Sequence, residues 1–137
     1  MRIVRKDPRE LNASEAAKLY RLTFPDVSVL HDDFKYIRQE SSKTEAYVFI
    51  AYEGDKVIGW ALVERQNGSN KGPYSFMEYV RKSYRTKGIG KRIFLRAMKF
   101  IEKQNIYWRT AVYQHDVVSE EFFKRMKKIS PVSLNML

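Results

Sequence analysis

The feature that most constrains the fold is a strand-like run that passes through a short glycine-containing turn into an amphipathic helix. Residues 74–80 read as the strand, and Gly88 and Gly90 lie in the turn. From 89 to 103 the apolar residues recur at helical spacing, which predicts one buried stripe made of Ile89, Ile93, Ala97, Met98 and Ile101. A chain with this passage places a helix N-terminus beside the end of a strand.

This junction is a predicted anion site. The first backbone N–H groups of a helix have no intrahelical acceptor, and the helix dipole favours negative charge beside them. Gly88 and Gly90 have no side chain that would keep a diphosphate away, and Arg85, Lys87 and Lys91 add positive charge. A merely structural turn is the alternative interpretation.

Two other phosphate-binding motifs do not fit the same segment. A dinucleotide-binding turn needs a third glycine at the position of Ile93. A Walker-type loop needs serine or threonine after Lys91, and this chain has Arg92 there.

The other segments predict an alternation of strands and helices. We expect strands at 2–6, 46–52, 56–63, 106–113 and 132–137, and helices beginning near Asn12 and spanning 32–40 and 119–128. Gly54 and Asp55 predict a tight hairpin, because both tolerate the positive φ of such turns. The order βααβββαβαβ favours an α+β or three-layer αβα domain.

Composition narrows the possible functions. A chain of 137 residues suits one domain. It has no cysteine and only two histidines, His31 and His115, so we expect no disulfide and no metal site. No apolar run resembles a signal peptide or a membrane span, so we expect a cytoplasmic protein without a membrane partner.

The net charge of +10 is unevenly distributed. Residues 81–103 contain nine basic side chains and one acid, Glu102. Such a field attracts phosphate-bearing partners, although a solvated helix face would have the same composition.

The segment 80–90 resembles the acetyl-CoA-binding motif of the GNAT superfamily of N-acetyltransferases. That motif is glutamine or arginine, two residues, glycine, one residue, then glycine or alanine, which here is Arg85 followed by Gly88 and Gly90. The lead-in from Val80 is also similar, with Lys82 in place of a common proline. The element order resembles the family's over nearly the whole chain. The resemblance implies a single domain at 1–137 with a mixed, mostly antiparallel sheet of about six strands, four helices and a truncated C-terminal hairpin.

The resemblance also implies an activity and a cofactor site. The protein would transfer an acetyl group from acetyl-CoA to a primary amine by direct attack in a ternary complex. The strand at 74–80 would diverge from the strand at 106–113, and the pantetheine arm would lie in the gap. The implied cofactor contacts are Val80, Lys82, Arg85, Thr86, Lys87, Gly88, Ile89, Gly90, Lys91, Asp116 and Phe123.

The sequence also contains candidate catalytic residues. Glu78 shares a strand face with Val80 and is the first candidate for the general base, with Glu64 and His115 as weaker ones. A charge-pairing Glu78 is an equal alternative. Many family members have a tyrosine as general acid where this chain has Phe123, so Tyr113 becomes a candidate acid.

The acceptor and the assembly stay open. The amine could belong to a small molecule, a protein or an aminoacyl-tRNA, and the acids Asp26, Asp32 and Asp33 favour a cationic acceptor. A partner subunit could complete the shortened C-terminal sheet, which favours a homodimer. The rival function is a basic nucleic-acid-binding or inhibitor protein that keeps the fold without catalysis.

Overall fold

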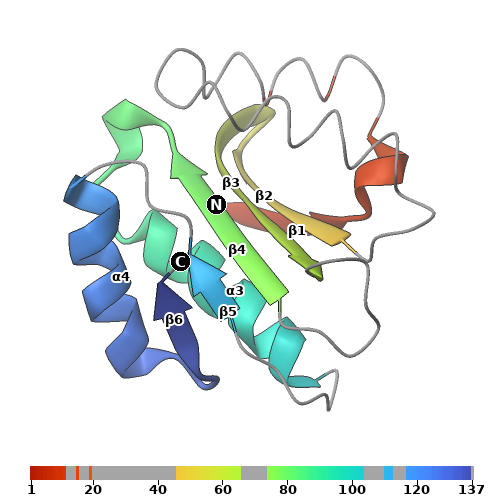
Figure 1. The fold of residues 1–137 in the computed structure, drawn as a ribbon. Coiled ribbons are helices and arrows are strands. Elements are labelled where there is room, and N and C mark those ends of the chain that lie inside the picture. The colour runs from red at the N-terminus through yellow and green to blue at the C-terminus, as the bar shows by residue number, and fades with distance from the viewer. Residues whose placement is uncertain are drawn as a thin grey trace.

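A computed structural model of the chain describes residues 1–11, 15, 19, 46–65, 74–103, 110–112 and 117–136. Their centre is a sheet of six strands (Figure 1), with two longer helices, α3 (Ile89–Lys103) and α4 (Val117–Ile129). The strands are β1 (Arg2–Lys6), β2 (Ala46–Glu53), β3 (Lys56–Arg65), β4 (Tyr74–Val80), β5 (Thr110–Val112) and β6 (Leu134–Met136). Two short 3-10 helices, η1 (Pro8–Glu10) and η3 (Lys82–Tyr84), follow β1 and β4.

The strand order in the sheet is the order in the chain, β1 to β6. The first four strands pair antiparallel, whereas β4 with β5 and β5 with β6 pair parallel. Parallel neighbours need a crossover connection, and α3 and α4 lie in the two connections. The predicted mixed, mostly antiparallel sheet with helices is therefore confirmed.

The hairpin between β2 and β3 turns through Gly54 and Asp55, as the sequence predicts. Gly54 has φ +60°, and Asp55 is not among the described residues with positive φ. One positive φ at the first central residue is the pattern of a type II′ turn, so only the glycine uses the left-handed region.

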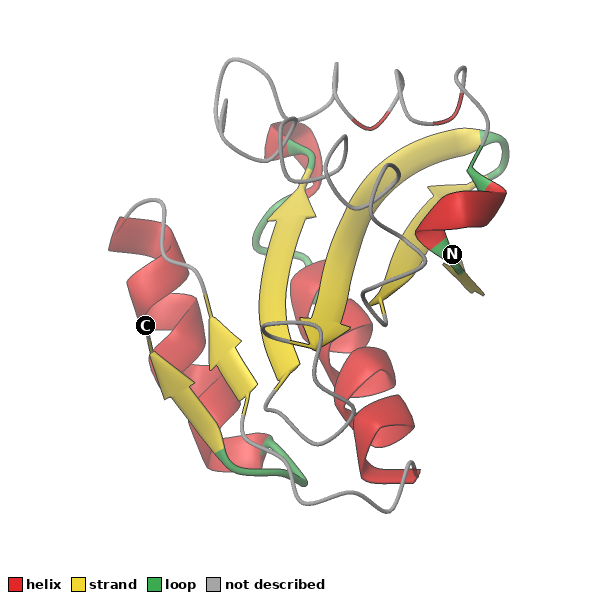
Figure 2. Cartoon of the chain, turned by 45° about the vertical axis from the view of Figure 1, so that its right-hand side comes forward, coloured by secondary structure: helices red, strands yellow, loops and turns green. Residues whose placement is uncertain are grey.

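Two apolar cores lie on the two faces of the sheet because neighbouring strand residues point to opposite sides. The helix-side core joins α3 and α4 to one face and includes Phe49, Phe76, Phe94, Phe123 and Met126. The opposite core includes Leu19, Val48, Ile50, Trp60, Leu62 and Tyr79. Figure 2 shows α3 and α4 behind the same side of the sheet.

The predicted element bounds agree closely with the described ones. The helix expected at 89–103 is α3, and the helix expected at 119–128 is the core of α4. The strands expected at 106–113 and 132–137 shorten to β5 and β6 within the described residues. The helix predicted at 32–40 lies outside the described residues, as does most of the helix predicted after Asn12. None of the helices described is long and apolar enough to cross a membrane.

Candidate functional site

The β4–α3 connection is a tight loop held by its own backbone. Tyr84 N donates to Arg81 O at 2.7 Å, and Arg85 N donates to Lys82 O at 3.3 Å. At the far end, Arg92 N donates to Gly88 O at 3.2 Å, which is the first bond of the α3 ladder. Gly88 is therefore the N-cap, and helix geometry leaves the N–H groups from Gly88 to Lys91 without an intrahelical acceptor.

Two residues of this loop adopt left-handed backbone conformations. Gly88 has φ +80°, and a Cβ atom there would meet nothing within 4 Å. Thr86 has φ +66° and is the one non-glycine residue with positive φ among those described. A β-branched residue in this region is strained. The glycine at 88 is thus explained by its backbone conformation, and Thr86 stores strain inside the loop.

Gly90 has a different explanation from the one that the sequence suggests. A Cβ atom at Gly90 would lie 3.1 Å from Oε1 of Glu78 and 3.2 Å from Cε2 of Phe122. That atom would point into the protein, toward β4 and α4. The missing side chain therefore allows close packing beneath the helix N-terminus.

Arg85 anchors the loop to β4. Its Nε donates to Val80 O at 2.9 Å, and its guanidinium carbon lies 5.2 Å from the centre of the Tyr79 ring. A half-buried cation over an aromatic face is a stabilising arrangement. The arginine that the sequence assigns as counter-charge thus also fixes the shape of the loop.

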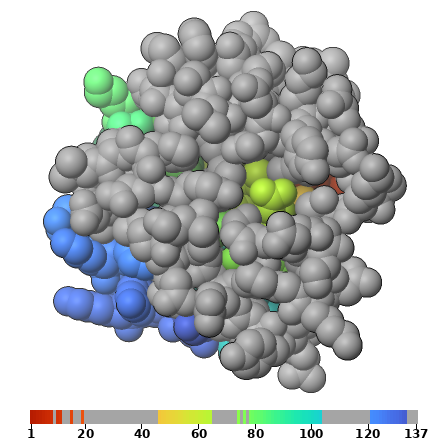
Figure 3. Space-filling model, in the orientation of Figure 1, coloured from red at the N-terminus to blue at the C-terminus, as the bar shows by residue number. Residues whose placement is uncertain are grey.

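The exposed charges around the N-terminus of α3 are positive. Lys82, Lys87, Lys91 and Arg92 are exposed, and the first turn of α3 contains no acid. The Nε of Arg81 is buried and has no hydrogen-bond partner in the part of the chain that is described. The segment around η3 projects from the molecule at the upper left of Figure 3. These features favour an anion at this end of the helix.

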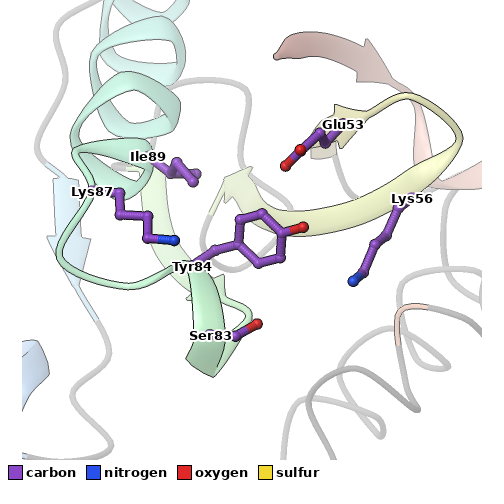
Figure 4. A pocket seen from close by; sticks show the side chains of 6 residues that line it. All are labelled: Glu53, Lys56, Ser83, Tyr84, Lys87 and Ile89. Carbon is purple, nitrogen blue, oxygen red and sulfur yellow. The ribbon is translucent and has the colours of Figure 1, made fainter.

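An open pocket of about 470 Å³ borders the loop on the side of the β2–β3 hairpin. Its lining residues are Glu53, Lys56, Ser83, Tyr84, Lys87 and Ile89 (Figure 4). The ammonium groups of Lys56 and Lys87 lie 5.3 Å and 5.5 Å from the centre of the Tyr84 ring. The lining thus combines two lysines with one carboxylate, that of Glu53.

The ladder described between β4 and β5 ends before β4 reaches the loop. β4 pairs with β3 from Tyr74 to Val80, but with β5 only from Tyr74 to Phe76 within the described residues. The last four residues of β4, from Met77 to Val80, thus extend beyond the ladder described with β5. A ligand that runs along the end of β4 would use the backbone groups there.

Glu78 lies on these last four residues of β4 and points into the protein. Its neighbours Phe76 and Val80 pack in the helix-side core, whereas Tyr79 belongs to the opposite core, so Glu78 faces α3 and α4. Both carboxyl oxygens are buried, and neither has a hydrogen-bond partner in the described structure. Burial raises the pKa of the Glu78 carboxyl well above its usual value of 4.5.

The other predicted site residues are distributed unevenly. Phe123 is buried in the helix-side core, with 7% of its surface exposed. Glu64 pairs with Ser75, at the end of the β3–β4 ladder away from the loop. Three candidates, Tyr113, His115 and Asp116, lie outside the described residues, as do Asp26, Asp32 and Asp33.

Sequence reasoning did not predict that Phe122 contacts the loop. Its ring lies over Gly90 and also meets Phe94 edge-on, with ring centres 6.3 Å apart. The helix expected at 119–128 does not identify the neighbours of Phe122, because they depend on how α4 docks beside α3.

Several solved structures share this fold. An aminoglycoside acetyltransferase from an uncultured soil metagenomic sample, solved with sisomicin, is 21% identical, with a TM-score of 0.65 over 95% of this chain and 87% of that one. The aminoglycoside N-acetyltransferase AAC(6')-Iy, solved with CoA, is 16% identical, with a TM-score of 0.61 over 91% and 89%. An acetyltransferase of Trypanosoma brucei is 16% identical, with a TM-score of 0.58 over 96% and 94%.

The sequence itself shows the family to which the chain belongs. No curated protein matches this sequence at a significant level. The model of the acetyltransferase (GNAT) family, however, matches residues 13–127, which include the β4–α3 loop and most of the sheet. The chain therefore belongs to the GNAT family of acetyltransferases.

Proposed function

We propose that the protein is an N-acetyltransferase that moves the acetyl group of acetyl-CoA to a primary amine, by direct attack in a ternary complex. The observation that carries this proposal is the N-terminus of α3, where backbone N–H groups without an intrahelical acceptor, a glycine N-cap and exposed lysines lie next to the end of β4. The family and the neighbour solved with CoA support the choice of cofactor.

The residues of the loop fit a diphosphate. The N–H groups from Gly88 to Lys91 would donate to its oxygens, and the ammonium groups of Lys87 and Lys91 would balance its charge. Arg85 and Thr86 would hold the loop in shape. Val80 and Lys82 would contact the pantetheine arm with backbone groups. Asp116 and Phe123 stay predicted cofactor contacts.

The end of β4 next to the loop supports the remaining chemistry. Attack by a neutral amine places negative charge on the carbonyl oxygen, and a backbone N–H near Val80 would stabilise it. Glu78 as the general base stays a prediction, as do Tyr113 as acid and His115 as a weak candidate. A base must be ionised before it accepts a proton, and the burial of Glu78 works against ionisation.

Thermal melting with acetyl-CoA tests the cofactor proposal. At a hundred times its dissociation constant the ligand should add about 2.7 kcal/mol of stability. Lys91→Glu should abolish the shift, because it places a carboxylate on the diphosphate site. The unliganded protein should keep its stability, since an acid in the first turn suits the helix dipole. Lys99→Glu, an exposed change of equal charge about 12 Å along α3, is the matched control.

Two results would contradict the cofactor proposal. One is a wild-type protein whose melting temperature does not respond to millimolar acetyl-CoA. The other is a Lys91→Glu variant that responds as strongly as Lys99→Glu, which would show that the diphosphate binds elsewhere.

The acceptor is proposed to be a cationic amine, and the candidates are small molecules, protein amines and aminoacyl-tRNA. Because a neighbour was solved with sisomicin, aminoglycosides are the first compounds to test, followed by polyamines and lysine peptides. Release of the CoA thiol measures turnover. Intersecting initial-velocity lines would support a ternary complex, whereas parallel lines would indicate a covalent acetyl-enzyme and contradict direct attack.

One observation favours the rival function, a nucleic-acid-binding or inhibitor protein. The exposed side chains of α3 and α4 are mostly cationic: Lys91, Arg92, Arg96, Lys99, Lys103, Lys124, Arg125, Lys127 and Lys128. Among the described residues, one of these cations pairs with an acid, Lys124 with Glu121 at 3.9 Å. Binding of RNA that weakens steeply with salt, in a protein without turnover, would support this reading.

A homodimer is also proposed. β6 ends the described sheet and has one described neighbour, β5, so its outer edge could pair with a second copy. Sedimentation of the wild type should show a dimer, and a Pro substitution at Asn135 within β6 should shift it to monomer. A wild-type protein that sediments as a monomer would contradict this proposal.

A further inference from the structure

The carboxyl of Glu78 is the most unusual polar group in the described structure. Both oxygens are buried, and neither has a hydrogen-bond partner there. Natural proteins pair nearly all buried polar groups, so an unpaired one calls for a reason. A carboxyl that lowers stability without a visible partner is a candidate for function.

Glu78 lies where β4, α3 and α4 come together. It lies on the last four residues of β4, where the ladder described with β5 has ended. Its side chain lies beneath the first turn of α3, with Oε1 3.1 Å from the Cβ position of Gly90. Phe122 of α4 meets the same point of Gly90. Three elements that surround the proposed cofactor path thus meet at this carboxyl.

The surroundings of Glu78 contain no charge in the described structure. From α3 the neighbour is Gly90, from α4 it is Phe122, and Phe76 and Val80 share its strand face. Burial raises the pKa of the Glu78 carboxyl, and no charged group among the described residues contributes to that shift. Burial therefore favours the neutral form of the carboxyl, in which one oxygen carries a proton that it can donate.

We propose that Glu78 is the proton donor to the sulfur of CoA when the thioester breaks. This inference rests on the proposed acetyl transfer and assigns Glu78 the opposite role to the general base that the sequence suggests. The neighbouring aromatic residues of α4, Phe122 and Phe123, have no proton to give.

The step is balanced. The amine nitrogen bonds to the acetyl carbon, the C–S bond breaks, and its electron pair goes to sulfur. Glu78 gives its proton to sulfur and becomes a carboxylate. The proton that the amine nitrogen loses reaches Glu78 through water, so the products are the amide and neutral CoA. A cysteine thiol has a pKa of about 8.5, so an acid with a raised pKa is suited to protonating a sulfur of this kind.

Glu78→Gln is the informative variant, because it keeps the shape of the side chain but cannot release a proton. We expect kcat with acetyl-CoA to fall about 10²- to 10⁴-fold, while the KM for acetyl-CoA and the thermal shift stay near the wild-type values. In the wild type, the rate should fall at high pH as Glu78 ionises, and the variant should lack that descending limb. Glu102→Gln, an exposed amide substitution on α3, is the control.

Two readouts need no amine acceptor. In the free protein, infrared spectroscopy at neutral pH should show a protonated carboxyl band that Glu78→Gln removes. In the complex with CoA, ultraviolet absorbance of the thiolate should give a thiol pKa that differs between wild type and Glu78→Gln, because close groups shift each other's titration.

The outcomes separate the inference from the proposed function. A wild-type protein without an acetyl-CoA shift contradicts both. A protein that binds acetyl-CoA but shows the same thiol pKa in wild type and variant overturns the role of Glu78 alone. Loss of the ascending limb of the pH–rate profile, in place of the descending one, would overturn the donor role and identify Glu78 as the base.

Discussion

Replacing Glu78 with methionine should stabilise the protein, and the structure allows the size of the effect to be worked out. A buried polar group without a hydrogen-bond partner costs about 1–3 kcal/mol. Methionine has a similar length and no polar group to desolvate. An imperfect fit of its side chain would reduce the gain in stability by less than about 1.5 kcal/mol. We therefore expect a net gain of about 1–2 kcal/mol in the free energy of unfolding below about pH 4.5, where Glu78 is protonated in both the folded and the unfolded state.

The gain should also depend on pH in a known direction. The pKa of Glu78 is raised in the folded state above its usual 4.5, so the folded protein holds a proton that the unfolded chain releases. The wild type therefore loses stability as pH rises from 4.5 to the folded pKa, and is constant above it. Methionine does not titrate. The advantage of the variant should be smallest near pH 4.5 and should grow as pH rises.

Thermal melting across pH measures both effects. The unfolding entropy is about 2.1 cal/mol/K per residue, so for 137 residues a gain of 1–2 kcal/mol raises Tm by about 3–7 °C. Glu78→Gln separates the two causes, because it stays polar but does not titrate, and should lose the pH dependence with a smaller gain. Two results would refute the reasoning: a methionine variant that is no more stable than the wild type at pH 7, or a difference in stability between them that does not change with pH.

Three further substitutions test the packing of the site. Gly59→Ala should destabilise the protein by about 1–3 kcal/mol in urea denaturation, because its Cβ would lie 3.0 Å from Tyr79 O and 3.1 Å from Cδ1 of Ile93. A neutral effect would mean that β4 and α3 can shift apart. Thr86→Gly should stabilise the protein by about 0.5–1 kcal/mol in thermal melting, because relief of a left-handed conformation worth about 1–2 kcal/mol exceeds the cost of the added freedom of the unfolded chain. Thr86→Ala keeps that conformation and should show no gain. Equal Tm values for the two variants would count against strain at φ +66°. Phe94→Ala should lower the free energy of unfolding by about 3–5 kcal/mol in urea denaturation, because the ring is fully buried between Phe76 and Phe122. A loss below 1 kcal/mol would show that the helix-side core closes over the cavity.

Much of the fold is predictable because local patterns decide it. The apolar spacing of α3 and the glycine turn that precedes it place the helix at 89–103, as observed. The hairpin at Gly54 follows from the same kind of local rule. Phe94 is the exception, because the predicted stripe of α3 omits it although the ring is fully buried. The packing of both Phe76 and Phe122 against α3 widens the buried face beyond one stripe.

The site is less predictable, because its contacts join distant parts of the chain. The sequence correctly places Glu78 on the same face as Val80, since alternate strand residues share a face. It does not reveal that Phe122 closes over Gly90, because that contact depends on where α4 docks. It also assigns Arg85 to the ligand alone, whereas the bond to Val80 O is made inside the protein.

The order of the strands has a consequence for the speed and sequence of folding. Because β2, β3 and β4 are successive in the chain and adjacent in the sheet, each can find its partner by closing a short loop, which is the fast kind of event in folding. β1 must wait for a partner some forty residues later in the chain, and the parallel pairs of β5 and β6 must wait for their crossover helices. We expect the β2–β4 meander to form first, so that during synthesis on a ribosome the face of Phe76 and Val80 is uncovered until α3 emerges to cover it.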